Sequence, residues 1–520
     1  MTSLPPLSLA APLVLLAAAA FALARPGRRP GGLPRLAEAA ALAALALAGA
    51  GVVQLIAAGG GTFGIGRGAG LLAIRLDAVS ATMALLVAFV GWVVVRYARS
   101  YLDGDAREGA FHGLLLATLG AVLLLVQAGS LAVLVLAFLA VGAGLRLLLL
   151  HYRERPEARR AAAKFALVWG AGDAALVVAA GLLWAAFGTA DLARISAAAA
   201  GGLPPAAQLA VGFLVLAALL KTAAFPLHGW LTEVMEAPTP VSALLHAGII
   251  NGGGFLMIRL ADLVQASTGA MAALVMLGGL TALFGAAVML TQSAVKTSLA
   301  WSTVSQMGFM LLQCGLGLWT LALLHIVAHS LYKAHAFLGS GTAVAAVNAI
   351  RKPGPVAIPG RGAVVRSFAL ALLLYAAVAA GFAVAVGGKS AQALALGAIL
   401  IFGVAYLVAQ GMADAAPRDL SRRTFAASAG VAVAYFGFHV LAEALWGAGL
   451  PAPPAPGALE WALIVLALGS FGLVALAQAL FPHWAHHPAS AGLRVHLANG
   501  FYLNALLDRV IGGLRTAKPL

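Results

Sequence analysis

The chain has 520 residues, of which 62% are hydrophobic and only 9% are charged, and its formal net charge is +15. Because an ordinary soluble domain carries about 25% charged residues, this composition excludes a soluble protein and indicates a membrane protein. A nucleic-acid-binding protein would gather its basic residues on one surface, whereas here they lie mostly in the connections between apolar runs.

Apolar runs of about 20 residues, the length needed to cross a bilayer, recur along the whole chain. They predict an all-α polytopic membrane protein with about 14–15 transmembrane helices. The expected spans cover residues 8–25, 36–58, 78–98, 110–128, 130–150, 162–187, 206–228, 240–260, 269–292, 297–317, 319–349, 364–386, 391–412, 424–446 and 458–480.

Most of the 32 Lys and Arg residues lie in the connections after odd-numbered spans and in the C-terminal tail. This asymmetry follows the positive-inside rule and predicts an N-out/C-in protein of the bacterial inner membrane, with the N-terminus in the periplasm. The first apolar run has no basic residue before it and a basic cluster after it, at Arg25, Arg28 and Arg29. We therefore expect a first span there and not a cleaved signal peptide.

Few signs of cofactor chemistry are present. Cys314 is the single cysteine, so the chain offers no intrachain disulfide, thiolate zinc site or iron–sulfur cluster. The sequence contains no P-loop and no GxGxxG motif after a strand. We expect no cofactor in this chain.

The most informative segment is the run from Lys221 to His228, followed by a Pro-Thr-Pro turn and His246. A lysine at the centre of a membrane helix costs roughly 2.5–3.5 kcal/mol on insertion scales, so it needs a reason to be there. Pro226 removes a backbone hydrogen bond and opens the helix next to Lys221. A charge beside a broken helix is typical of an ion path, to which we assign Lys221, His246 and His228. A snorkelling lysine and satisfied core histidines are the structural alternative.

A second group of ionisable residues follows in the run Leu324–Phe337. Spacings of four place His325, His329 and Lys333 on one helical face, where they could relay a proton. Two histidines four apart can also bind zinc, as in HExxH, but here a lysine follows and no carboxylate is near in sequence. Helix–helix hydrogen bonding alone is the third interpretation.

Two more residues are candidates for the same path. Asp173 is the clearest carboxylate in the middle of one of the first ten spans. It is either a structural partner for a basic residue or a carboxylate that tunes the proton affinity of a lysine. Lys296 lies near a membrane face and is either an ordinary loop lysine or a relay member reaching inward.

Over roughly residues 75–345, the order and spacing of these motifs resemble the antiporter-like subunits of respiratory complex I and of Mrp cation/proton antiporters. By that resemblance Lys221 is similar to the central proton-handling lysine. Asp173 corresponds to the acidic residue of the sixth span. The relay residues implied in the same way are His246, Lys296, His325, His329 and Lys333.

The departures from this family are informative. The glutamate that usually pairs with the central lysine from the preceding helix is replaced, and its position corresponds to Leu139. A second broken helix with its own lysine is expected in the second half, and only Gly387-Gly388-Lys389-Ser390 offers a counterpart. The long C-terminal lateral helix is also missing. The chain therefore fits poorly as a complex I subunit.

A narrower resemblance covers nearly the whole chain. The runs 151–165, 246–259, 324–337, 389–400 and 498–503 are similar to the DabB family, the membrane subunits of DAB inorganic-carbon accumulation complexes. That resemblance implies a cytoplasmic partner, DabA, which resembles a β-type carbonic anhydrase and holds the zinc. Flow of H+ or Na+ through the membrane subunit is then expected to drive hydration of CO2 to bicarbonate.

Four regions are expected: N-terminal transmembrane helices in 1–74, the antiporter-like core in 75–349, degenerate second-half helices in 350–480, and a cytoplasmic tail in 481–520. The tail is either an amphipathic helix on the membrane surface or a disordered end. Two basic segments predicted on the cytoplasmic face, Arg153–Lys164 and Arg351–Arg366, could meet a partner.

The expected function is that of a cation-conducting subunit without catalysis of its own, with H+ as the expected ion. A proton-pumping subunit of a complex I, hydrogenase or Mrp-type assembly is the main alternative. A membrane metalloenzyme using His325 and His329 and a passive anchor for a soluble enzyme also stay open.

Overall fold

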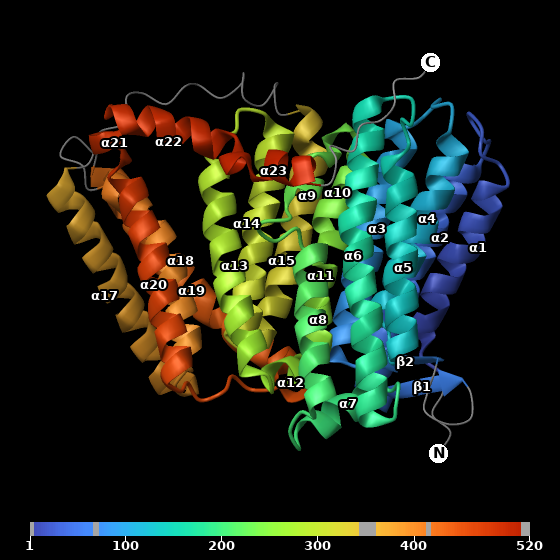
Figure 1. Ribbon diagram of the computed structural model, residues 1–520, viewed down its shortest axis with the longest axis horizontal. Helices are drawn as coiled ribbons and strands as arrows, with labels where there is room; N and C mark the ends of the chain where they lie inside the picture. The colour runs from blue at the N-terminus through green and yellow to red at the C-terminus, as the bar shows by residue number, and fades with distance from the viewer. Residues whose placement is uncertain (1–4, 66–71, 343–359, 412–417, 511–520) are drawn as a thin grey trace.

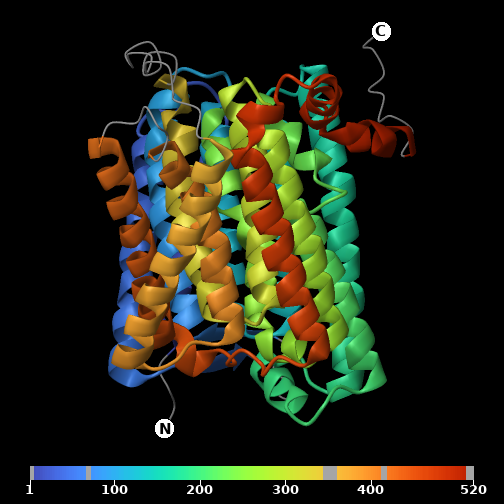
Figure 2. The same ribbon diagram turned by 90° about the vertical axis from the view of Figure 1, so that its left-hand side faces the viewer.

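The computed structural model of the protein describes residues 5–65, 72–342, 360–411 and 418–510. The long helices run roughly parallel to one common axis, and short helices lie across the two ends of the bundle (Figures 1 and 2). The chain order runs across the molecule, from α1 at one side to α17 and α20 at the other (Figure 1). Part of the segment Arg351–Arg366, residues 351–359, lies outside the described residues.

The elements of the N-terminal part are η1 (Leu7–Leu9), α1 (Ala10–Leu23), α2 (Leu33–Ala58), β1 (Gly61–Ile65), β2 (Leu72–Leu76), α3 (Ala78–Tyr101), α4 (Glu108–Val126), α5 (Leu131–Leu149), α6 (Pro156–Phe187), α7 (Leu192–Ala199) and α8 (Pro205–Lys221). The middle part continues with α9 (Gly229–Thr232), η2 (Val234–Glu236), α10 (Thr239–Ala247), η3 (Ile249–Asn251), α11 (Gly252–Arg259), α12 (Ala261–Gln265), α13 (Thr268–Met289), α14 (Val295–Gly315), α15 (Trp319–Leu338) and η4 (Gly339–Thr342). The last part contains α17 (Arg361–Val386), α18 (Ala391–Gly411), α19 (Arg418–Trp446), η5 (Gly447–Gly449), α20 (Ala458–Ala479), α21 (Phe481–Trp484), α22 (Pro488–Ala498), η6 (Gly500–Tyr502) and α23 (Leu503–Val510).

The membrane spans agree with the apolar runs of the sequence. Within the described residues, eleven helical segments are long and apolar enough to cross a membrane. Three shorter apolar helices, Leu7–Leu23, Pro205–Lys221 and Ala391–Ala405, match further predicted spans. The remaining predicted span is α14, a 21-residue helix interrupted by several polar side chains. The predicted all-α polytopic bundle is confirmed.

One small sheet was not predicted. Strands β1 and β2 form an antiparallel hairpin in which Gly61 pairs with Leu76. Its second strand also bonds to the connection between α4 and α5, because Arg75 N donates to Gln127 O at 2.8 Å and Gly129 N donates to Ala73 O at 2.8 Å. The hairpin forms here because this connection supplies backbone partners that no local pattern in residues 61–76 reveals.

A buried ion pair fixes the end of the bundle on which the hairpin lies. Asp77 caps α3 by accepting from Ser80 N at 2.7 Å, and Ser80 Oγ accepts from Asp77 N in return. Arg259, at the end of α11, donates from Nη1 to Asp77 Oδ2 at 2.7 Å, and its side chain is only 2% exposed. Burial would raise the pKa of Asp77, but Arg259 and Arg75 hold it at about 2.

The C-terminal helices α21, α22 and α23 lie across the opposite end of the bundle, where the red ribbon extends from α20 toward α9 (Figure 1). Their end is held by Lys164, whose side chain is fully buried and whose Nζ lies 2.7 Å from Glu233 Oε1 and 2.6 Å from Asp508 Oδ1. Arg160 Nη2 adds a second contact with Asp508 at 2.5 Å. The described part of the tail is therefore helical and docked by charge onto α6 and the segment after α9.

Removing the charge of Asp77 should destabilise the protein in a pH-dependent way. The Asp77 pKa falls from 3.8 to about 2 on folding. Because each pKa unit between the folded and unfolded states corresponds to about 1.36 kcal/mol, Asp77→Asn is expected to lower the free energy of unfolding by about 2 kcal/mol at neutral pH. A carboxylate whose pKa is lower in the folded state stabilises the fold when the pH is above its pKa in the unfolded state. This stabilisation is lost as the pH falls through its pKa in the folded state. The penalty should therefore shrink below pH ~4 and vanish near pH ~2.

Thermal unfolding in detergent across this pH range measures the effect. The matched control is Asp103→Asn, because the Asp103 side chain is 67% exposed and lies 3.7 Å from Arg29 in a surface ion pair. Such pairs contribute about 0–1 kcal/mol. Equal, pH-independent penalties for the two variants would contradict the prediction.

Candidate functional site

The centre of the site is a buried ion pair between two membrane helices. Lys221 is the last residue of α8, its side chain is fully buried, and its Nζ donates to Asp173 Oδ1 of α6 at 2.5 Å. The same ammonium lies 4.0 Å from the ring centroid of Trp169 and 4.8 Å from that of Phe138. Lysine, carboxylate and two aromatic faces therefore form one enclosed charge site, in which cation–π contact adds to the ion pair. Asp173 and Lys221 were singled out separately, and the structure brings them together.

The helix break beside this pair occurs as the sequence predicts. Helix α8 ends at Lys221, and α9 begins only at Gly229, with Pro226 in between. A second interruption separates α10 from α11, and there glycine is required. A Cβ on Gly253 would lie 2.6 Å from Ala218 O, so only glycine lets α11 lie this close to α8.

The second cluster forms where α10, α14 and α15 meet. His246 is fully buried, its Nδ1 lies 3.1 Å from Thr303 Oγ1, and its ring stacks on Phe337 with centroids 4.2 Å apart. Lys333 is also fully buried and donates from Nζ to Ser302 Oγ at 2.8 Å and to Leu299 O at 3.1 Å. Among the described residues, no carboxylate forms an ion pair with Lys333, so neutral oxygens alone solvate this ammonium.

The two relay histidines lie along α15 as predicted. Their ring centroids are 6.0 Å apart, and His325 Nδ1 lies 2.9 Å from Gln313 Oε1. His325 Nε2 and both ring nitrogens of His329 are buried and have no hydrogen-bond partner in the described part of the chain. Buried polar atoms of this kind normally bond to protein or to ordered water.

Asn251 lies between the two clusters, and sequence reasoning missed it. Its Nδ2 donates to Ser330 Oγ at 3.1 Å, next to His329, and its buried Oδ1 has no partner among the described residues. Two cavities of about 20 Å³ meet at Asn251, one lined by Phe138 and Trp169 and the other by Ser330. Each is large enough for one water molecule.

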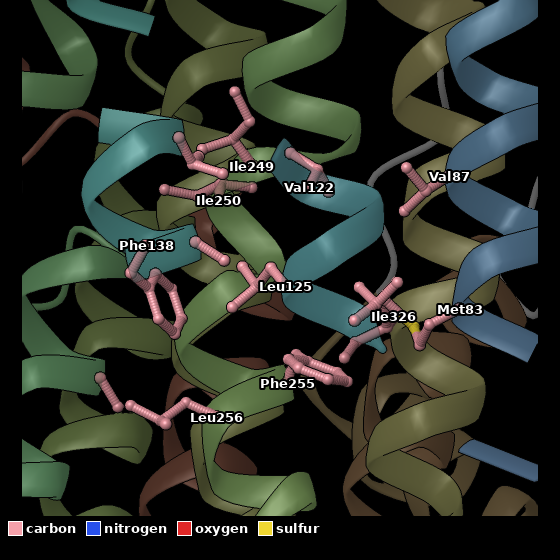
Figure 3. Close-up of a cluster of buried hydrophobic side chains, with 14 of the residues drawn as sticks. Met83, Val87, Val122, Leu125, Phe138, Ile249, Ile250, Phe255, Leu256 and Ile326 are labelled. Carbon is pink, nitrogen blue, oxygen red and sulfur yellow. The ribbon is translucent and has the colours of Figure 1, made fainter. Parts of the chain in front are cut away.

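The wall around these cavities is apolar. Figure 3 shows part of the buried apolar cluster. Its labelled side chains include Met83, Val87, Ile249 and Phe255, which line one or both of these cavities. Asn251 is a polar side chain that lines both cavities. A polar residue beside the Gly252–Gly254 triplet was the signal that could have identified it.

Three predicted path residues lie away from the two clusters. His228 precedes α9 and packs among aromatic rings, 4.9 Å from Trp301 and 5.2 Å from Phe284. Lys296 is half-buried at the start of α14, one turn before Leu299. Lys389 is half-buried in the connection between α17 and α18, so its glycine-rich segment is not a break inside a span.

The structure also shows where Leu139 lies relative to Lys221. Leu139 is 41% exposed on the outer surface of α5, whereas the neighbouring Phe138 is fully buried against Lys221. A side chain at 139 therefore points away from Lys221 in this structure, and α6 supplies the carboxylate instead. No group of three or more His, Cys, Asp or Glu side chains that could hold a metal ion is found in the parts of the chain that the structure describes.

Comparison with known proteins gives the family. A family model described as "NADH:quinone oxidoreductase/Mrp antiporter, TM" matches residues 128–353, and the model of the complex I chain 5 N-terminus matches residues 71–112. The "Probable inorganic carbon transporter subunit DabB2" of Halothiobacillus neapolitanus is 38% identical over 88% of this chain and 83% of its own length. The chain belongs to the DabB family. The family consists of membrane transporter subunits and not of enzymes, and it is related to the antiporter-like subunits of complex I and Mrp.

Two further comparisons support this family assignment. The "Probable inorganic carbon transporter subunit DabB" of Hydrogenovibrio crunogenus is 43% identical over 52% of this chain and 53% of its own length. A chain of the Mrp complex from Dietzia sp. DQ12-45-1b has the same fold, with a TM-score of 0.65 and 23% identity over 98% of this chain and 60% of that chain. With the bacterial relatives and the apolar helices, this makes the protein a multi-pass protein of the bacterial inner membrane.

Removing one member of the central pair should cost more stability than removing both. Asp173→Leu leaves Lys221 buried without a counter-ion, which typically costs about 3–5 kcal/mol. The double variant Asp173→Leu/Lys221→Met replaces both charges by apolar groups and should recover most of that loss. Thermal unfolding of the two variants in detergent tests the prediction. A double variant as unstable as Asp173→Leu would show that the two charges do not depend on each other.

Proposed function

We propose that this protein conducts protons across the membrane and thereby energises the accumulation of inorganic carbon by a cytoplasmic partner that resembles carbonic anhydrase. The observation that carries the proposal is the buried Lys221–Asp173 pair at the end of an interrupted helix. A charge pair in an apolar bundle has no structural advantage over an apolar pair of similar volume. A transported charge is the reason that best accounts for it.

The pair can store and release one proton. Burial disfavours the two charges, whereas their contact at 2.5 Å favours them, so transfer of a proton from Lys221 Nζ to Asp173 Oδ1 leaves both groups neutral. The rings of Phe138 and Trp169 favour the protonated lysine by cation–π contact. A positive charge that arrives near the pair would disfavour the protonated form of Lys221. The pair therefore responds to the charge of the second cluster.

The route between the clusters runs through Asn251. A proton on His329 has Ser330 and Asn251 as its next polar neighbours toward Lys221, with space for one water on each side of the amide. From the same cluster, Lys333 and His246 lead toward α14 and the cytoplasmic face. Lys296 lies there, in the first turn of α14. His228 and Asp173 would connect the Lys221 side to that face, and Lys389 belongs to the periplasmic side.

The energy would be used on the cytoplasmic face. We assign zinc and the hydration of CO2 to a DabA-like partner, and none of this chemistry to the present chain. Support comes from the inorganic carbon transporter names of the relatives and from the cytoplasmic location that the basic loops predict. The docked helix α23 contacts α6, the helix of Asp173, through Lys164. A change in the Lys221–Asp173 pair therefore has a direct mechanical connection to that surface.

Loss of Lys221 should abolish coupled carbon accumulation. In Lys221→Ala the site no longer carries the proton, so ion-driven uptake of labelled bicarbonate by cells should fall to background while the protein still assembles. Arg146→Ala is the control, because Arg146 is a cation of a spanning helix that faces outward. Normal uptake in Lys221→Ala would remove the central claim.

Mild purification of the tagged protein from its native membrane identifies the partner. One large soluble zinc protein is the expected companion. A set of other polytopic antiporter-like subunits with redox proteins would instead indicate a complex I, hydrogenase or Mrp-type pump.

Replacing Asn251 by leucine should block exchange between the clusters. One missing hydrogen bond to a charged group is worth roughly 1.5–3 kcal/mol, so proton flux should fall by about 10- to 100-fold. Gln392→Leu is the matched control, since Gln392 is 2% exposed, bonds to Pro454 O and lies outside the route. Proton flux into membrane vesicles, followed with a trapped pH dye, measures both variants. Equal flux in Asn251→Leu and wild type would rule out this connection.

A further inference from the structure

A pair of ionisable residues lies outside the path described above. Helix α19 carries His439 and Glu443 one turn apart. Glu443 Oε1 accepts a hydrogen bond from Thr320 Oγ1 of α15 at 2.6 Å and lies 3.6 Å from His439 Nε2. His439 is only 4% exposed, whereas the Glu443 side chain is 41% exposed. The pair therefore joins a buried imidazole to a carboxylate at the protein surface.

Burial and the charge of Lys389 disfavour a positive charge on His439, whereas the Glu443 carboxylate favours it. Glu443 and Lys389 are the charged groups that act on His439, the latter from the connection between α17 and α18, and Thr320 on α15 is neutral. The ring nitrogen that points away from Glu443, His439 Nδ1, is buried without a hydrogen-bond partner among the described residues. An imidazole with one nitrogen toward a carboxylate and the other free can take up a proton on one side and release it on the other.

The pair also lies next to an open, mostly apolar groove that reaches the relay histidines. Thr320 is five residues before His325 on α15, a rise of roughly 7.5 Å at 1.5 Å per residue. Tyr435, one turn before His439, lines a cavity of about 460 Å³ together with His325 and His329. Helix α15 starts at the end of the bundle opposite the docked tail, which the charge distribution assigns to the periplasm (Figure 1).

We propose that Glu443 and His439 form a proton-uptake site at the periplasmic end of the path and feed His325. The proposal rests on the proposed function. A proton from the periplasm binds the Glu443 carboxylate and passes to His439 Nε2, and the imidazolium then releases the proton on Nδ1 toward the Tyr435 side of the groove. Return of the ring from the Nε2–H to the Nδ1–H tautomer restores the pair for the next proton. An alkali cation would need several oxygen ligands, whereas the site offers one carboxylate, one hydroxyl and one imidazole nitrogen, a set that suits a proton.

Three variants separate proton uptake from a structural role. Glu443→Gln keeps an oxygen that can accept the bond from Thr320 but loses the charge and the proton. Thr320→Val loses the bond but keeps the carboxylate. Glu460→Gln is the matched control, because Glu460 is a glutamate that caps the start of α20 through a 2.9 Å bond from Gly457 N.

The measurement is proton flux into right-side-out membrane vesicles that contain the protein in its native complex, driven by an imposed inside-negative potential. We expect Glu443→Gln to lower the flux about tenfold at mildly alkaline outer pH. A charged site raises the local concentration of a counter-ion by about 10- to 1,000-fold, and this figure is the low end of that range. The loss should be smaller at mildly acidic outer pH, where protons are abundant. Glu443→Asp should restore most of the flux, and Thr320→Val and Glu460→Gln should match wild type.

Two results would overturn the proposal: an unchanged flux and pH profile in Glu443→Gln, or an equal loss in Thr320→Val. Lys221→Ala, measured in the same vesicles, separates this failure from that of the proposed function. If Lys221→Ala loses its flux while Glu443→Gln keeps it, uptake occurs elsewhere and the proposed function stands. If Lys221→Ala keeps its flux, the proposed function itself is wrong, and the uptake site with it.

Discussion

The cost of holding charge inside an apolar bundle governs this structure. Lys221 and Lys333 are both fully buried, and the protein treats them differently. Lys221 has a carboxylate, Asp173, and two aromatic faces, whereas Lys333 has a hydroxyl and a backbone carbonyl. An ammonium with neutral ligands gives up its proton more easily than one with a counter-ion. Under the proposed function, this difference between the two lysines would give charge movement a direction.

The helix interruptions follow from the same constraint. Free backbone groups inside a membrane are tolerated only where protein or water satisfies them. The breaks after Lys221 and around Asn251 lie inside the bundle, where α6, α14 and α15 surround them. Gly253 allows α11 to approach α8 closely, whereas Gly252 faces Phe138 of α5 and Gly254 faces Met310 of α14. The interrupted helices and the buried charges are therefore parts of a single arrangement.

Much of this could be predicted from the sequence, and the exceptions have a common cause. Span positions depend on local length and hydropathy, so the predicted spans match helical segments, although the span 240–260 is divided into α10, η3 and α11. Lys221 and Asp173 stand out because a charge in an apolar run is a local signal. Their contact, the role of Phe138, and the docking of Asp508 on Lys164 depend on which helices become neighbours, and no local pattern determines that. Asn251 was overlooked because a neutral amide is less conspicuous than a charge, although between two charged clusters it has the decisive position.

By the resemblance to antiporter-like subunits, Leu139 stands where a glutamate is usual, and the charge site of this chain is built from other positions. Loss of the family's usual glutamate from α5 would leave the central lysine unpaired if that glutamate were its only partner. Here Asp173 approaches Lys221 from α6, and Phe138 occupies the α5 side of the site. Leu139 faces outward, where an ionised carboxylate would meet lipid or a neighbouring subunit. Leucine at this position places an apolar side chain on that surface.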